Sequence, residues 1–200
     1  VRITSYYGHG YSYYSMGSDY KWNADVLETN KKNGYASTEN PGSGTATFWN
    51  ATVEVQADGF QADNIIFENS FNQYVSKKAA DDIIVKLSDK AEDRYALYVG
   101  STAVQQKSYV ERAAALAIGN GKSDITFNGC KFIGRQDTLY GGTNTYAEFN
   151  NCSIYGGTDY IFGGMIAIFD KCDLVFNTTD NSNDVGYITA AQQKSGRGYL

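Results

Sequence analysis

Two aspartates stand at equivalent places in a repeated stretch of the sequence. Asp137 lies seven residues after Cys130, and Asp159 lies seven residues after Cys152. If each stretch forms one turn of a repetitive fold, the two carboxylates lie side by side, since strands paired in a ladder are about 4.8 Å apart. Two carboxylates this close cannot both ionise easily, so one pKa should rise while the other stays low. A protonated acid beside an ionised carboxylate suits acid–base or nucleophilic catalysis, although both residues could instead be turn formers that end their strands.

The repeat that aligns these aspartates has three strong copies. Residues 125–132 (ITFNGCKF) match residues 147–154 (AEFNNCSI) 22 positions later, and residues 167–174 (AIFDKCDL) follow after 20 more. Each copy reads as two short strands joined at a polar corner, with apolar residues pointing inward on both sides of it. Stacking Cys130, Cys152 and Cys172 on three successive coils is therefore a direct prediction of the spacing.

Two weaker copies precede these three. Residues 65–71 keep the phenylalanine as Phe67 and have Ser70 at the cysteine position, while residues 46–51 have Ala51 there. One such unit cannot bury its apolar face alone, but stacked units can, through columns of like residues. A period near 20 residues without helical segments predicts an all-β fold, a parallel β-helix. The alternative fold is a β-sandwich, which would show hairpin turns about every 8–12 residues.

The period breaks between Phe67 and Phe127. Residues 77–106 in this gap are polar and charged, and we interpret residues at about 72–110 as an insertion from one coil. Residues 111–118 (ERAAALAI) then return to the stack. A short helix is the alternative for this alanine-rich stretch.

Composition excludes several function classes. The net charge of −5 argues against a nucleic-acid partner, and no apolar run approaches the length of a membrane span. The three cysteines lack C-x-x-C spacing, and residues 180–184 lack the glycine and glutamate of a calcium loop, so we predict no metal and no cofactor. A Ser-His-Asp site is not expected, because His9 is the single histidine and no G-x-S-x-G elbow is present.

Two motifs around the aspartates resemble signatures of the pectin methylesterase (pectinesterase) family. Residues 134–140 (GRQDTLY) resemble its G-x-Q-D-T-L-Y motif, and residues 157–163 (GTDYIFG) resemble its second motif, in which D-[FY]-I-F-G follows Val or Thr. Residues 113–116 and 187–190 resemble the Q-A-V-A-L block upstream and the Y-I-T-A strand downstream. The similarity covers roughly residues 65–190 apart from the insertion, and two motifs in family order are strong evidence.

The resemblance implies a right-handed, pectin-lyase-like β-helix that hydrolyses the methyl esters of pectin (homogalacturonan), giving de-esterified pectin and methanol. Asp159 matches the family's nucleophile. Asp137 matches the general acid that protonates the leaving methanol and then acts as the base on water. Gln136 matches an oxyanion donor, whose neutral amide stabilises negative charge without titrating.

The resemblance also implies a sugar cleft. Tyr140 and Phe162 match its aromatic walls, although core packing is the alternative for Phe162, and we add Thr158 and Arg112 as substrate-binding candidates. The expected partner is methylated pectin, with no nucleic acid and no membrane. We expect a secreted or cell-surface protein that modifies the cell wall, as a monomer or as part of a larger multidomain chain.

Two departures from the family pattern matter. Arg112 stands where the family has a second glutamine, and it could be a stronger donor or pair with Glu111 or Asp137. The family's L-G-R-P-W motif, whose arginine orients the nucleophile, does not occur in the 200 residues. We therefore interpret residues 1–200 as a partial β-helix domain that lacks its C-terminal coils. Cys152 and Cys172 match positions that are bridged in some relatives.

Two rival functions stay open on the sequence alone. The first is a β-helix glycoside hydrolase or lyase acting on polygalacturonate, because carboxylates about 5 Å apart also suit a retaining glycosidase. The second is a non-catalytic, glycan-binding β-helix module, which the missing arginine motif favours. Methanol release without new reducing ends would separate the esterase from the first rival.

Overall fold

The computed structural model describes residues 1–5, 51–70, 113–177, 186–193 and 198–200. All regular elements in these ranges are strands, and all strand pairs are parallel. The predicted insertion at 72–110, the copy at 46–50, His9, Arg112 and residues 180–184 lie outside these ranges. None of the described residues forms a helix that is long and apolar enough to cross a membrane.

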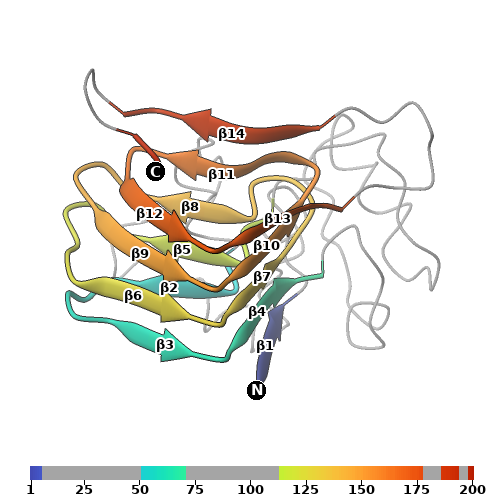
Figure 1. The fold of residues 1–200 in the computed structure, drawn as a ribbon, viewed down its shortest axis with the longest axis horizontal. Coiled ribbons are helices and arrows are strands. Elements are labelled where there is room, and N and C mark those ends of the chain that lie inside the picture. Colours follow the sequence, from blue (N-terminus) through green and yellow to red (C-terminus); the bar gives the residue numbers. More distant parts are fainter. Residues whose placement is uncertain (6–50, 71–112, 178–185, 194–197) are drawn as a thin grey trace, which may run out of the picture.

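The strands form three sheets, and each complete coil gives one strand to each sheet (Figure 1). Sheet A contains, in order, β1 (Arg2–Ser5), β4 (Ile66–Asn69), β7 (Lys131–Ile133), β10 (Ser153–Gly156) and β13 (Asp173–Phe176). Sheet B contains β2 (Val53–Val55), β5 (Leu116–Ile118), β8 (Leu139–Gly141), β11 (Thr158–Gly163) and β14 (Tyr187–Ala191). Sheet C contains β3 (Gln61–Asp63), β6 (Ile125–Asn128), β9 (Tyr146–Asn150) and β12 (Ile166–Asp170). The predicted parallel β-helix is confirmed.

The interior is filled by two stacks of phenylalanine rings. Phe149 lies between Phe127 and Phe169, with ring centroids 5.0 and 4.7 Å away and planes tilted by 8° and 9°. Phe67 stacks on Phe132 at 5.4 Å in the same way. The stacks meet edge to face, with Phe127 and Phe132 at 5.2 Å and 83°. These columns of like residues join the coils along the axis of the fold.

The predicted match between residues 65–71 and the three strong copies of the repeat is wrong by one strand. Phe67 pairs with Phe132 in sheet A, and the residue that pairs with Phe127 in sheet C is Ala62. Ile65, rather than Ser70, therefore lies beside Cys130. The error has a physical cause, because each coil carries inward residues on both sides of its corner and a lone phenylalanine fits either strand.

Residues 113–118 form no helix, since residues 113–115 are irregular and Leu116–Ile118 form strand β5 of sheet B. β5 pairs with β2 on one side and with β8 on the other, and all three of its residues are buried. Ala113, Ala114 and Ala115 are also no more than 1% exposed. Small side chains suit this buried position. The backbone here is held by the next coil, since the Ala115 N–H donates to the Thr138 carbonyl at 2.8 Å.

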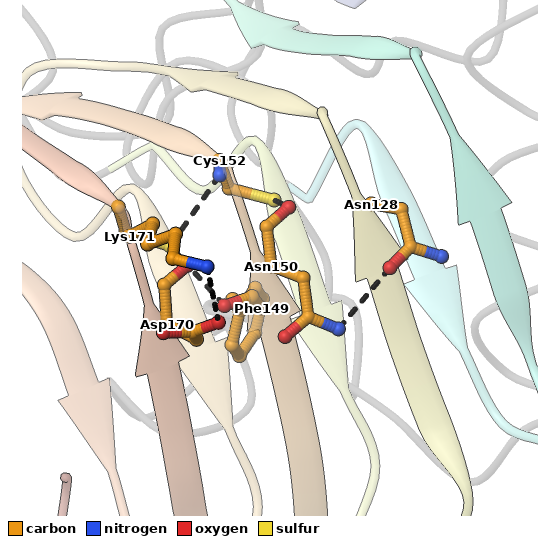
Figure 2. A network of polar contacts seen from close by, with 7 residues as sticks. Asn128, Phe149, Asn150, Cys152, Asp170 and Lys171 are labelled. Atoms are coloured by element: carbon orange, nitrogen blue, oxygen red, sulfur yellow. Dashed lines mark hydrogen bonds and ion pairs between the residues drawn. The ribbon is translucent and has the colours of Figure 1, made fainter.

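The corner between sheets C and A uses a left-handed residue in every coil. The residues are Asn64 (φ 56°), Gly129 (φ 61°), Asn151 (φ 53°) and Lys171 (φ 51°). The residue before each one lies in a polar column, in which Asn150 donates to Asn128 at 3.1 Å (Figure 2). Asn128 in turn donates to Asp63 at 2.8 Å. Asparagine tolerates this backbone region better than most residues, which explains the recurring Asn and Gly of the repeat.

The three cysteines lie in one column directly after these corners, as predicted. The residues that follow them, Lys131, Ser153 and Asp173, are paired across β7, β10 and β13. Each thiol lies against a carbonyl of the preceding coil: Cys130 against Ala62 at 3.3 Å, Cys152 against Phe127 at 3.5 Å, and Cys172 against Phe149 at 3.2 Å. All three are free thiols, so the structure contains no bridge between Cys152 and Cys172.

We expect thiol titration of the denatured protein to find three thiols, and the native protein to react slowly. Burial raises the pKa of Cys130 and Cys172 and raises that of Cys152 to about 12, so these thiols stay protonated in the folded chain at neutral pH. The thiolate is the reactive species. Labelling with a thiol reagent at pH 8 with and without denaturant gives the measurement. A single titratable thiol in the denatured, unreduced protein would instead show a bridge.

Candidate active site

The aspartates lie beside each other on adjacent coils. β8 and β11 pair in register, Leu139 with Ile161, and a bridge joins Gln136, which precedes β8, to Thr158, the first residue of β11. Asp137 and Asp159 are the next residues along, and the Asp137 N–H donates to the Thr158 carbonyl at 3.1 Å. The alignment predicted from the repeat is confirmed, whereas the catalytic roles stay predictions.

Both aspartates have left-handed backbone conformations. The φ angle is 61° at Asp137 and 48° at Asp159. The usual alternation of inward and outward side chains is interrupted at each left-handed residue. The two residues that follow each aspartate are both buried: Thr138 and Leu139 after Asp137, and Tyr160 and Ile161 after Asp159. Such conformations cost of the order of 1–3 kcal/mol and gather at active sites. The turn-forming and catalytic interpretations of these aspartates are therefore compatible.

The two carboxyl groups differ in exposure. Asp137 is only 8% exposed, whereas Asp159 is half-buried. Below Asp137, the buried Thr138 hydroxyl donates to the Tyr155 carbonyl at 2.9 Å and so fixes the floor of the site. Asp159 is thus the member of the pair that is more accessible to a substrate.

Gln136 lies at the edge of this pair. It is half-buried, its carbonyl accepts the Ala113 N–H at 3.0 Å, and it is bridged to Thr158 on the other side. Its backbone is therefore held by both neighbouring coils. A donor that is fixed before the reaction stabilises a developing oxyanion without reorganisation. Arg112, the other donor candidate, lies outside the described residues.

The aromatic candidates form a pair on the outer side of sheet B. Tyr140 and Phe162 are paired in register, and their rings lie 5.0 Å apart at 54°. Phe162 is 7% exposed and Tyr140 is half-buried, so Tyr140 offers the larger accessible face. Burial raises the pKa of Tyr140, which keeps its hydroxyl protonated. Phe162 is buried and packs against Tyr140, while its neighbour Ile161 belongs to the main core cluster. A place in the sugar cleft and core packing both stay open as interpretations of Phe162.

Gly163, which ends β11, cannot carry a side chain. Its φ is +100°, and a Cβ there would run into the Gly141 carbonyl oxygen and come within 2.9 Å of Tyr140 Cε2. The last residue of the second motif is therefore fixed by the close approach of the aromatic pair and the neighbouring coil. A side chain at this position would therefore have to displace Tyr140 or the neighbouring coil.

Sequence comparison identifies the family to which this site belongs. A sequence model described as Pectinesterase matches residues 99–198, half of the chain. The chain belongs to the pectinesterase family. The match contains the aspartate pair, Gln136 and the aromatic pair. A search of curated proteins found no match.

Solved pectin methylesterases share the fold. The enzyme from Yersinia enterocolitica is 24% identical with a TM-score of 0.60, over 100% of this chain and 48% of its own. PemA from Erwinia chrysanthemi is 25% identical with a TM-score of 0.52, over 76% of this chain and 39% of its own. The carrot enzyme is 20% identical with a TM-score of 0.55, over 100% of this chain and 41% of its own. The chain thus spans less than half the length of these pectinesterases.

Sequence analysis missed two features of the site. The left-handed backbone of the aspartates gives no signal beyond a residue type that tolerates it. Tyr199 was not considered at all, yet its hydroxyl donates to the Gly163 carbonyl at 3.1 Å. The interval between Phe169 and Tyr199 differs from the spacing of the repeat, so no pattern in the sequence indicated this contact.

Proposed function

We propose that this pectinesterase hydrolyses the methyl esters of pectin by an aspartyl mechanism. The observation that carries the proposal is the alignment of Asp137 and Asp159, both left-handed, on adjacent coils within the two family motifs. The shared fold and the pectin methylesterase names of the solved relatives support the substrate class.

The proposed reaction has two halves. An Asp159 carboxylate oxygen attacks the ester carbonyl carbon, and the Gln136 amide donates to the oxyanion that forms. Asp137 then protonates the methoxy oxygen, the C–O bond to it breaks, and methanol leaves an acyl anhydride on Asp159. In the second half Asp137 takes a proton from water, the hydroxide attacks the galacturonoyl carbonyl, and Asp159 departs as a carboxylate. Both carboxyl groups return to their starting protonation states.

The deciding experiment measures methanol and reducing ends together on highly methylated pectin. An esterase releases methanol without new chain ends, because only the ester bond is cleaved. New reducing ends would favour a glycoside hydrolase, and unsaturated ends would favour a lyase. Binding without either product would favour the non-catalytic module.

We expect Gln136→Ala to lower kcat for methanol release by roughly 10²–10³-fold, the typical contribution of one oxyanion donor. The substitution leaves its backbone contacts to Ala113 and Thr158 in place. Gln61→Ala is a matched control, because Gln61 is an exposed glutamine on β3 of sheet C. Unchanged kcat in folded Gln136→Ala would remove this residue from the mechanism.

The remaining assignments are also proposals. Thr158 lies between Gln136 and the nucleophile, where its side chain is half-buried and suits a contact to substrate. Arg112 precedes Ala113, and we propose that it replaces the family's second glutamine as a donor to the substrate. Action on pectin further suggests a secreted or cell-surface protein, acting as a monomer or within a larger chain.

A further inference from the structure

Tyr199 reaches from one sheet to the end of the strand that carries the nucleophile. Its backbone continues sheet C, where it is bridged to Ala167 and the Leu200 N–H donates to the Ala167 carbonyl at 2.9 Å. Its ring meets Phe169 edge to face, with centroids 6.1 Å apart and planes at 90°. The ring is thus turned out of the phenylalanine stack, and its hydroxyl donates to Gly163 at 3.1 Å.

Gln193 makes a second contact to the turn at residues 163–165, which follows β11. Its side-chain amide donates to the Met165 carbonyl at 2.7 Å. It also hydrogen-bonds to Tyr199, while burial and the nearby Tyr140 together raise the Tyr199 pKa to about 12. The Tyr199 hydroxyl therefore stays a donor throughout the usual pH range. Two side chains that follow β14 consequently hold the carbonyls of Gly163 and Met165.

This turn is packed directly against the aromatic pair. Gly163 follows Phe162, and its backbone leaves no room for a Cβ beside Tyr140. The Met165 side chain, which is fully buried, fills the space above Gly141, the residue after Tyr140. A shift of the turn would therefore be transmitted to both rings.

We propose that Tyr199 and Gln193 are positioning residues that hold the Tyr140–Phe162 pair in place for a sugar ring of the substrate. This inference rests on the proposed function. Phe162 lies three residues after Asp159, within about 10 Å along the strand. The pair therefore contacts the polysaccharide beside the reacting ester, and its displacement should weaken binding more than it slows the chemical step.

The test is Tyr199→Phe, which removes the hydroxyl and keeps the ring against Phe169. We expect KM for methyl-esterified galacturonan oligosaccharides to rise roughly 2- to 10-fold, the effect that one lost hydrogen bond allows, with kcat within about twofold of wild type. Tyr146→Phe is the matched control, because Tyr146 is a 49% exposed tyrosine on sheet C. It should leave both constants unchanged.

Gln193→Ala provides an independent variant, since it should raise KM without touching the core. Its effect and that of Tyr199→Phe should not add in the double variant, because both act on one turn. Unchanged KM in both single variants, or a fall in kcat alone, would overturn the inference.

Calorimetric binding of the same oligosaccharides separates this inference from the proposed function. If wild-type protein binds but releases no methanol, the esterase proposal fails, and weaker binding by Tyr199→Phe still supports the positioning role. Equal binding by wild type and both variants overturns it. Wild-type protein that neither binds nor turns over the oligosaccharides overturns both proposals.

Discussion

Asp159→Asn and Asp137→Asn should each lower methanol release from methylated pectin by roughly 10²–10⁴-fold or more. The first substitution removes the attacking charge, and the second keeps a hydrogen-bond donor that cannot release and take back a proton. Asparagine accepts the left-handed backbone as readily as aspartate, so the φ values of 48° and 61° at these positions need not change. The loss should therefore be catalytic rather than conformational.

Asp173→Asn is the matched control, because Asp173 is an exposed aspartate on β13 of sheet A. Its turnover should equal that of wild type, and unfolding curves of all three variants should coincide. Near-normal turnover by folded Asp159→Asn would end the covalent assignment. Near-normal turnover by both site variants would move the active site elsewhere.

A coupled carboxyl pair also has a consequence for pH dependence. In the proposed mechanism the rate requires Asp159 ionised and Asp137 protonated, so it should fall at low pH as the nucleophile is protonated and at high pH as the acid is lost. A rate that rises steadily with pH would indicate hydroxide attack without a carboxylic acid.

The repeat made the coil arrangement predictable from the sequence. Spacings of 22 and 20 residues align Cys130, Cys152 and Cys172, and the same period brings Asp137 beside Asp159. This success has a simple reason, since neighbouring coils must match in length if their inward residues are to form columns. Phe67 was placed on the wrong strand because its coil lacks the cysteine that fixes the alignment elsewhere.

The finer geometry of the site could not be predicted in this way. The left-handed backbone of Asp159 coincides with an irregularity between coils, because β11 and β14 pair with a register shift between Thr158 and Ile161. The Tyr199–Gly163 hydrogen bond joins residues 36 positions apart from different sheets. Periodicity describes positions within a column, whereas this hydrogen bond joins one sheet to another, and a register shift interrupts the period within its own sheet.

Phe149→Ala should destabilise the fold by about 3–5 kcal/mol, the usual cost of truncating a buried aromatic residue. Phe149 is fully buried, is stacked between Phe127 and Phe169, and meets Phe132 edge to face at 5.6 Å. Each coil of a solenoid contacts only its neighbours, so this cavity weakens the interfaces on both sides of the coil that carries Phe149 and Asp159. We expect a lower denaturant midpoint, together with a less cooperative transition as the two halves of the stack begin to unfold separately.

Ile168→Ala is the control for this prediction, because Ile168 is 44% exposed on the adjacent strand β12 and its truncation leaves no cavity. Phe149→Leu should fall between the two, since leucine refills most of the space without restoring the stack. The loss of unfolding free energy, measured with urea, should be largest for Phe149→Ala, smaller for Phe149→Leu and smallest for Ile168→Ala. A loss below about 1 kcal/mol for Phe149→Ala would mean that the stacked rings contribute little to the contact between coils. Other contacts would then have to set the register that places the two aspartates side by side.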